Sequence, residues 1–137
     1  MDVRRAARMA YLVVAWVFVV CLLAQVFLSG MGVFVGAEKF AAHTEFGRAF
    51  GWLTLILIAL AIIGRLGWRR IWLSVLVFAL FVLQSVFVAL RETAPVVSAL
   101  HPVNGFLILW ISIWLAQRAR REFRNPAGEA AAEPVAA

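Results

Sequence analysis

Long apolar stretches alternate with short polar connections along this chain. Four of them approach or exceed the roughly 20 helical residues that cross the hydrocarbon core of a bilayer. They lie at about residues 9–30, 43–64, 71–90 and 96–116. Within them the apolar residues are continuous and lack the alternation that marks a strand of a membrane barrel. The pattern therefore predicts an all-α integral membrane protein, a four-helix bundle that fills residues 1–124.

Composition agrees with a lipid environment. The 137 residues are 65% hydrophobic and only 15% charged, far from the balance of a soluble domain. Residues 125–137 are small, acidic and interrupted by proline, so we expect a disordered cytoplasmic tail there. The first apolar stretch exceeds the core of a cleaved secretory signal, which is about 7 to 15 residues long, and no typical cleavage site ends it. We expect it to remain as a helix.

The net charge of +6 raises the question of a nucleic-acid partner, which the distribution of the charges answers. Most of the 13 basic residues precede the first stretch, lie between the second and third, or follow the fourth. The opposite connections hold only Lys39, Arg48 and Arg91. This asymmetry predicts that both termini are cytoplasmic and that the partner is the lipid bilayer, with no nucleic acid. Arginine far outnumbers lysine, which is typical of GC-rich bacteria, so we expect a bacterial inner membrane.

An internal repeat is the most informative feature of the sequence. Each half contains a glutamine, a histidine 18 or 17 residues later, and a glycine four residues after the histidine. These residues are Gln25, His43 and Gly47 in the first half and Gln84, His101 and Gly105 in the second. The chain has 2 histidines, and both belong to this pattern. The halves are therefore predicted to be helical hairpins of the same topology, related by an axis along the membrane normal.

Such an axis keeps equivalent residues at equal depth, so His43 and His101 are predicted to face each other near the outer face. Two neutral imidazoles inside a four-helix bundle suit the two axial positions of a b-type haem iron. A glycine one turn from each histidine, Gly47 or Gly105, would leave room for the edge of the porphyrin. The pattern thus favours one bound haem b, used for electron transfer or haem handling with a membrane redox partner.

Polar residues near the histidines complete the predicted site. Gln25 and Gln84 lie at a depth from which they can contact a histidine N–H or the haem edge, and Arg48 is the candidate to pair with haem propionates. A cofactor-free interpretation stays open, in which the histidines and glutamines only join helices through hydrogen bonds. The chain would then be an accessory subunit of a membrane complex. A homodimer is also left open.

No catalytic pattern accompanies the histidines. A catalytic zinc needs three protein ligands, and Glu45 would be a strained third one beside the two histidines. Cys21 is the single cysteine, and the absence of a C-x-x-C-H string excludes ordinary covalent haem attachment. We therefore expect a protein that is not an enzyme on its own.

The strings LQSVFVALRETAPVVSALHPVNGFLIL and QVFLSGMGVF, the latter followed by AAHTEFG, resemble a family of small four-helix bacterial membrane proteins of unknown function. The resemblance covers all four predicted helices. More distantly, a Leu-Gln near the end of one span and a histidine in the next is similar to one half of haem A synthase, whose halves bind haem through paired histidines. This resemblance implies a haem role for His43 and His101. The synthase's second half and its outer-loop cysteines are absent here, so haem A synthesis is not implied.

Overall fold

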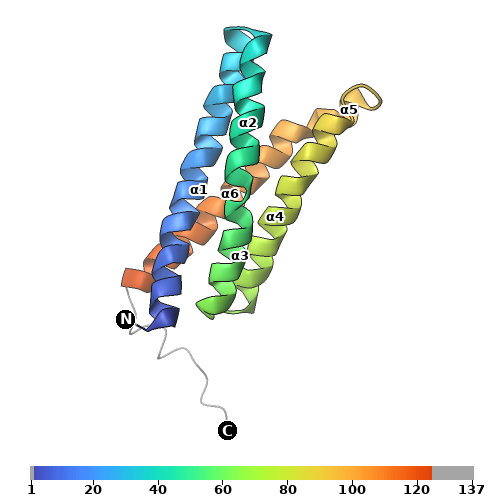
Figure 1. Cartoon of the computed structure of the whole chain (residues 1–137). Coiled ribbons are helices and arrows are strands. Elements are labelled where there is room, and N and C mark those ends of the chain that lie inside the picture. The colour runs from blue at the N-terminus through green and yellow to red at the C-terminus, as the bar shows by residue number, and fades with distance from the viewer. Residues whose placement is uncertain (1, 125–137) are drawn as a thin grey trace.

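The computed structural model describes residues 2–124, which form a helical bundle without strands (Figure 1). Within this range 4 segments are long and apolar enough to cross a membrane, namely Val3–Phe34, Ala37–Ile63, Trp68–Ala89 and Pro95–Arg124. This confirms the predicted all-α bundle of four membrane-spanning helices. The predicted tail at 125–137 lies outside the described residues.

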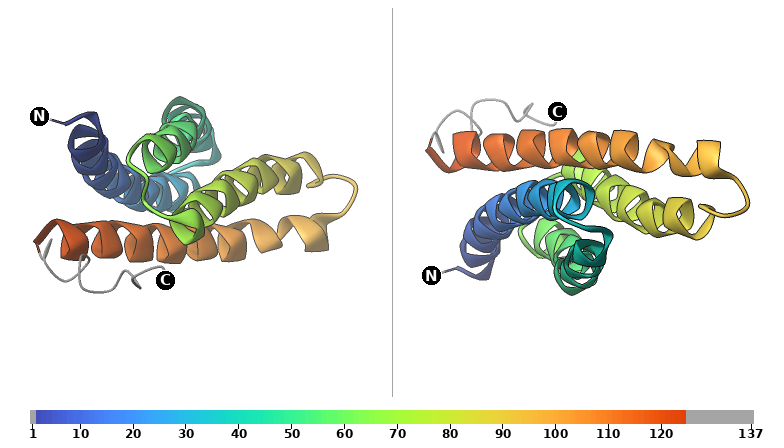
Figure 2. Two further views of the ribbon diagram at one scale, coloured as in Figure 1. Left: turned by 90° about the horizontal axis from the view of Figure 1, so that it is seen from below. Right: turned by 90° about the horizontal axis from the view of Figure 1, so that it is seen from above.

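Two antiparallel hairpins make up the bundle. The elements are α1 (Val3–Phe34), the 3₁₀ helix η1 (Ala37–Lys39), α2 (Phe40–Gly51), α3 (Leu53–Ile63), α4 (Trp68–Ala89), α5 (Pro95–Ser98) and α6 (Leu100–Arg124). Helices α1 and α4 each pack against both α3 and α6, so these four helices form a closed ring. The α4–α6 hairpin is inclined to the α1–α3 hairpin, and their tips point in different directions (Figure 2).

The helices extend beyond the apolar stretches that predicted them. Helix α1 begins at Val3 and continues to Phe34, α4 begins at Trp68 rather than at residue 71, and α6 continues to Arg124. Hydropathy marks only the part of a helix that lies in hydrocarbon, whereas the backbone hydrogen bonds continue into the polar region. The connections are correspondingly shorter than predicted, and several charged residues belong to helices.

The fourth span is interrupted at Ala99, between α5 and α6. Pro102 accounts for the break, because its nitrogen has no hydrogen to donate to the carbonyl of Ser98 and its ring crowds that carbonyl. Next to the break, the side-chain hydroxyl of Ser98 donates a hydrogen bond to the carbonyl oxygen of Phe87 on α4. The break and this bond place His101 in the first turn of α6, beside the end of α4.

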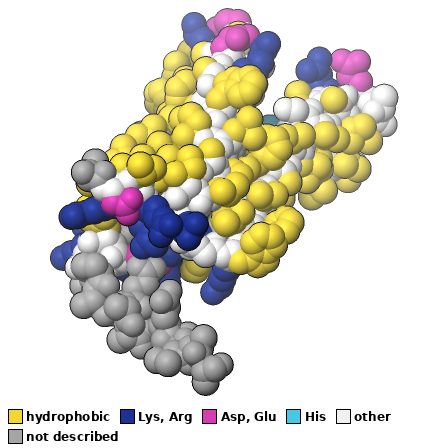
Figure 3. All heavy atoms as spheres, turned by 60° about the horizontal axis from the view of Figure 1, so that its bottom comes forward, with side chains coloured by type: hydrophobic (Ala, Val, Ile, Leu, Met, Phe, Trp, Pro, Cys, Tyr) yellow, Lys and Arg dark blue, Asp and Glu magenta, His cyan; other side chains and the backbone are white. Residues whose placement is uncertain are grey.

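Small and aromatic side chains fill the middle of the bundle. Buried residues of α1 recur every three or four positions, as in Tyr11, Ala15, Phe18 and Leu22. Other helices contribute fully buried small residues such as Ala61, which let backbones approach closely, the usual basis of helix association in lipid. Apolar side chains cover much of the visible outer surface (Figure 3), as expected for a surface that faces acyl chains.

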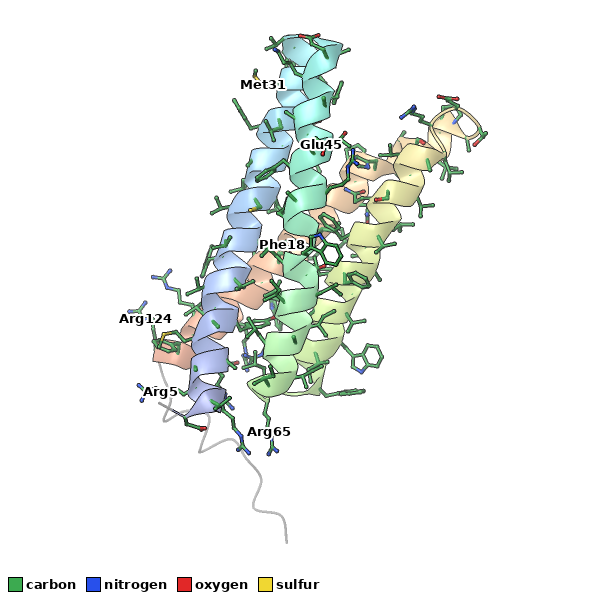
Figure 4. The ribbon with its side chains drawn as sticks, in the orientation of Figure 1. Arg5, Phe18, Met31, Glu45, Arg65 and Arg124 are labelled. Carbon is green, nitrogen blue, oxygen red and sulfur yellow. The ribbon has the colours of Figure 1, made fainter. Side chains whose placement is uncertain are left out.

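The two ends of the bundle carry different residues. One end, here called the arginine end, holds the start of α1, the turn between α3 and α4, and the last turns of α6; Arg5, Arg65 and Arg124 are labelled there in Figure 4. The opposite end, the histidine end, holds η1 and α5, and Met31 and Glu45 lie towards it (Figure 4). Both ends of the described chain lie at the arginine end, as an even number of spans requires.

Candidate functional site

A cavity of about 410 Å³ opens at the histidine end, between the two hairpins. Its lining includes every residue that the sequence predicts for the site, namely Gln25, His43, Gly47, Arg48, Gln84, His101 and Gly105. The space-filling view shows a hollow between two projecting tips, with part of a histidine side chain visible between them (Figure 3). The volume lies in the range of about 300–1,000 Å³ that is typical of small-molecule and cofactor sites.

Aromatic rings close the cavity towards the middle of the bundle. Phe18, Phe50 and Phe81 form a triangle whose ring centroids are 5.5, 6.1 and 5.4 Å apart. Gly51 leaves room for the ring of Phe81, because a Cβ at Gly51 would lie only 2.7 Å from that ring. Phe18 lies about midway along the bundle, and the two hairpins diverge from that level towards the histidine end (Figure 4). The triangle is therefore the floor of the site.

The two histidines lie opposite each other in this cavity, His43 on α2 and His101 on α6. Their ring centroids are 6.2 Å apart, and the ring planes are inclined by 61°. The Nδ1 of His43 is 3.1 Å from the carbonyl oxygen of Gln25, and the Nδ1 of His101 is 3.3 Å from that of Gln84. Because a carbonyl only accepts, Nδ1 is assigned the proton in both rings. In a neutral ring with this tautomer the lone pair lies on Nε2, through which imidazole binds metals.

The glutamines thus orient the histidines through the main chain rather than through their side-chain amides. Those amides lie beside the glycines instead. A Cβ at Gly47 would be 2.6 Å from Nε2 of Gln25, and a Cβ at Gly105 would be 3.1 Å from Nε2 of Gln84. In both halves, glutamine, histidine and glycine therefore form the same arrangement. Whether the glycines also leave room for a porphyrin edge stays a prediction.

The halves differ in how the glutamine amide is held. Asn104 donates through Nδ2 to Oε1 of Gln84, at 3.0 Å, and to the carbonyl of Leu80, at 2.9 Å. The equivalent residue of the first half is Phe46, which has no donor, and Oε1 of Gln25 is buried with no hydrogen-bond partner among residues 2–124. A buried acceptor left without a donor costs about 1–3 kcal/mol. The first half of the site therefore lacks the amide donor that Asn104 supplies in the second.

Asn104 is a site residue that the sequence analysis missed. The available signal was its position, since an amide three residues after His101 lies on nearly the same helix face as the histidine. Arg48, in contrast, is where the sequence predicts it. Its side chain is 70% exposed at the rim of the cavity, and Nη2 donates to Glu45 at 2.7 Å. An exposed pair of this kind contributes little stability, so the guanidinium can change partners.

Replacing Asn104 with alanine is expected to lower the free energy of unfolding by about 1–2 kcal/mol, because Oε1 of Gln84 and the carbonyl of Leu80 lose their donor. Unfolding of the protein in mixed micelles by added SDS, followed by circular dichroism, measures this. Thr44→Ala is the matched control, since this exposed hydroxyl bonds only the carbonyl of Phe40 in its own helix. Equal effects of the two changes would contradict the amide arrangement described for the second half.

The arrangement offers two protein ligands to a metal. Among residues 2–124 no three side chains of His, Cys, Asp or Glu come together as a group able to hold a metal ion. Two imidazoles are the complete protein contribution to a bis-histidine haem, whose iron has four further ligands in the porphyrin nitrogens. Haem ligation by His43 and His101 stays a prediction of the sequence at this point.

Comparison with known proteins gives a match to the model of a family of unknown function (DUF6220), which covers residues 25–92. The matched region begins at Gln25 and ends after α4, so it contains His43 and Gln84 but not His101. It is shorter than the resemblance over all four helices that the sequence suggested. No curated protein and no solved structure matches the chain. Over about half of its length, the chain is thus similar to a family of unknown function.

Proposed function

We propose that this membrane protein binds one b-type haem between His43 and His101, for electron transfer or haem handling. The observation that carries the proposal is the pair of opposed imidazoles, each with Nδ1 bonded to a backbone carbonyl. In metal sites a bond of this kind fixes the orientation of the ring and leaves Nε2 available to the metal.

The separation of the rings supports the fit. Imidazole nitrogens bind transition metals at about 2.0 Å, which puts the ring centroids of two axial ligands roughly 6 Å apart. The centroids of His43 and His101 are 6.2 Å apart. This agreement supports the proposal, because rings already at such a separation would need little movement of the helices to act as two axial ligands.

The lining of the cavity also suits a haem. Leu22, Phe81 and Leu109 contribute apolar walls, and the aromatic triangle excludes water from the side of the bundle interior. Arg48 at the rim is placed to pair with a propionate. A bound haem would supply one-electron chemistry, since its iron changes between the ferrous and ferric states. The chain's own residues hold, orient and shield the group.

The membrane orientation is part of this proposal. The arginine end faces the cytoplasm under the positive-inside rule, which counts the basic residues of short connections. The histidine site then lies near the outer face of a bacterial inner membrane. There it would be accessible to an electron-transfer partner in the membrane or outside it.

The absorption spectrum of the detergent-purified chain, oxidised and then reduced with dithionite, tests the proposal. We expect sharp α and Soret bands of a six-coordinate low-spin haem in the reduced protein, with one haem per chain by pyridine haemochrome assay. A protein that is colourless as purified, and stays so after haem is added, would overturn the proposal. The cofactor-free accessory subunit would then be the better account of the histidines.

A further inference from the structure

A second cavity, of about 640 Å³, lies at the arginine end, opposite to the histidines. It is bounded by the first turns of α1 and α4 and by the last turns of α6. Its charged lining residues are Asp2, Arg4, Arg5, Arg8, Arg70 and Glu122. The cavity is thus rich in groups that attract anions.

Arg70 is the buried member of this lining. Its side chain is only 8% exposed, and Nη2 forms an ion pair with Oε1 of Glu122. The other terminal nitrogen, Nη1, is buried and has no hydrogen-bond partner among residues 2–124. A buried guanidinium N–H without an acceptor is unfavourable. An anion in the cavity would supply the missing acceptor.

The acidic side chains of the cavity are already engaged. Glu122 accepts from Arg70 and also from Nε of Arg118, at 2.8 Å. The carboxylate of Asp2 accepts from the backbone nitrogen of Arg4 and so caps α1. The guanidinium groups of Arg4 and Arg5 have no acidic partner in the part of the chain that the structure describes. The cavity therefore has cationic groups in excess of its anionic ones.

Arg8 links two of the segments that surround the cavity. Its Nε donates to the carbonyl of Gly64, at 2.9 Å, which joins α1 to the turn after α3. Leu66 and Phe123 supply apolar surface next to the arginines. A phosphate beside apolar surface, at the end of membrane-spanning helices, is the chemistry of a phospholipid headgroup. Basic pockets between such helices bind anionic headgroups in this way.

We propose that this cavity binds the phosphate of an anionic phospholipid headgroup. The forked guanidinium donors match phosphate oxygens, with Arg70 as the buried donor and Arg4 and Arg5 as the outer ones. The apolar wall would receive the start of the acyl chains. The proposal is independent of haem binding, because the two cavities lie at opposite ends of the bundle and share no lining residue.

Native mass spectrometry of the full chain in detergent tests this. The probes are phosphatidylglycerol, phosphatidylcholine with the same acyl chains, and soluble glycerol 3-phosphate. We expect one retained phosphatidylglycerol per chain and at least fivefold weaker binding of phosphatidylcholine. Changing both Arg4 and Arg5 to alanine should weaken phosphatidylglycerol binding about tenfold or more. Arg70→Lys keeps a positive charge opposite Glu122 but removes the Nη1 donor, and should weaken binding severalfold.

The matched control changes Arg120 and Arg121 to alanine, which removes the same charge at the same end from residues outside the cavity. Its effect on phosphatidylglycerol binding should stay within twofold. Equal losses in the two double variants would show attraction to the surface charge alone and overturn the proposal, as would equal binding of the two lipids. Displacement of phosphatidylglycerol by an equal concentration of glycerol 3-phosphate would assign the cavity to a soluble phosphate and overturn the lipid assignment.

Discussion

Replacing either His43 or His101 with alanine is expected to abolish the low-spin haem spectrum of the purified protein and to weaken haem binding by at least about a hundredfold. Each change removes one of two axial ligands and leaves the opposite imidazole facing an empty space. Haem titration of the purified variants, followed at the Soret band, measures the loss. A low-spin spectrum of undiminished intensity in either variant would contradict bis-histidine ligation.

Replacement of the same residues by methionine separates ligation from packing. A thioether is an alternative axial ligand that raises the reduction potential of a haem, but it cannot donate to the carbonyl of Gln25 or Gln84 as Nδ1 does. We therefore expect His101→Met to retain haem with a higher potential, whereas His101→Ala loses it. If the histidines only join helices, methionine should behave like alanine in every measurement.

Glu122→Ala is expected to lower the free energy of unfolding by about 3–5 kcal/mol, because it leaves Arg70 as a buried and unpaired cation. The side chains of Arg70 and Glu122 are only 8% and 17% exposed, so water compensates poorly for the lost carboxylate. Unfolding by SDS in mixed micelles, followed by circular dichroism, measures the change.

A matched control comes from the exposed ion pair of Glu45 and Arg48, whose side chains are both 70% exposed. Glu45→Ala should cost less than about 1 kcal/mol. Removing both partners of the buried pair, as Arg70→Met with Glu122→Leu, should restore most of the stability lost in Glu122→Ala, because no uncompensated charge remains. If Glu122→Ala lowers the free energy of unfolding as little as Glu45→Ala does, the prediction is wrong, and the guanidinium of Arg70 is hydrated in the variant.

The membrane-spanning helices and the pairing of the two histidines could be predicted from the sequence because both depend on simple regularities. A hydrocarbon core demands continuous apolar helices whatever their neighbours are. The repeat, for its part, predicts equal depth for His43 and His101 without any knowledge of side-chain packing. The structure places both in one cavity with Gln25 and Gln84.

Other contacts could not be predicted, because they depend on where helices end and how they rotate. The apolar pattern predicts that Arg70 lies in the turn between the second and third spans, yet α4 begins at Trp68 and buries it. Its partner Glu122 lies 52 residues further on, beyond the predicted end of the fourth span. The bond between Asn104 and Gln84 likewise requires the exact rotation of α6 against α4. Apolar periodicity contains no information of that precision.

The aromatic triangle of Phe18, Phe50 and Phe81 also has a mechanical consequence. The rings join three helices at one level, and the tightly packed region beneath them acts as a rigid base. The two hairpin tips extend beyond this level and are separated by the cavity, so a change in their separation would leave the packing of the base intact. A molecule that bridges His43 and His101 would connect the two tips and hold them at a fixed separation.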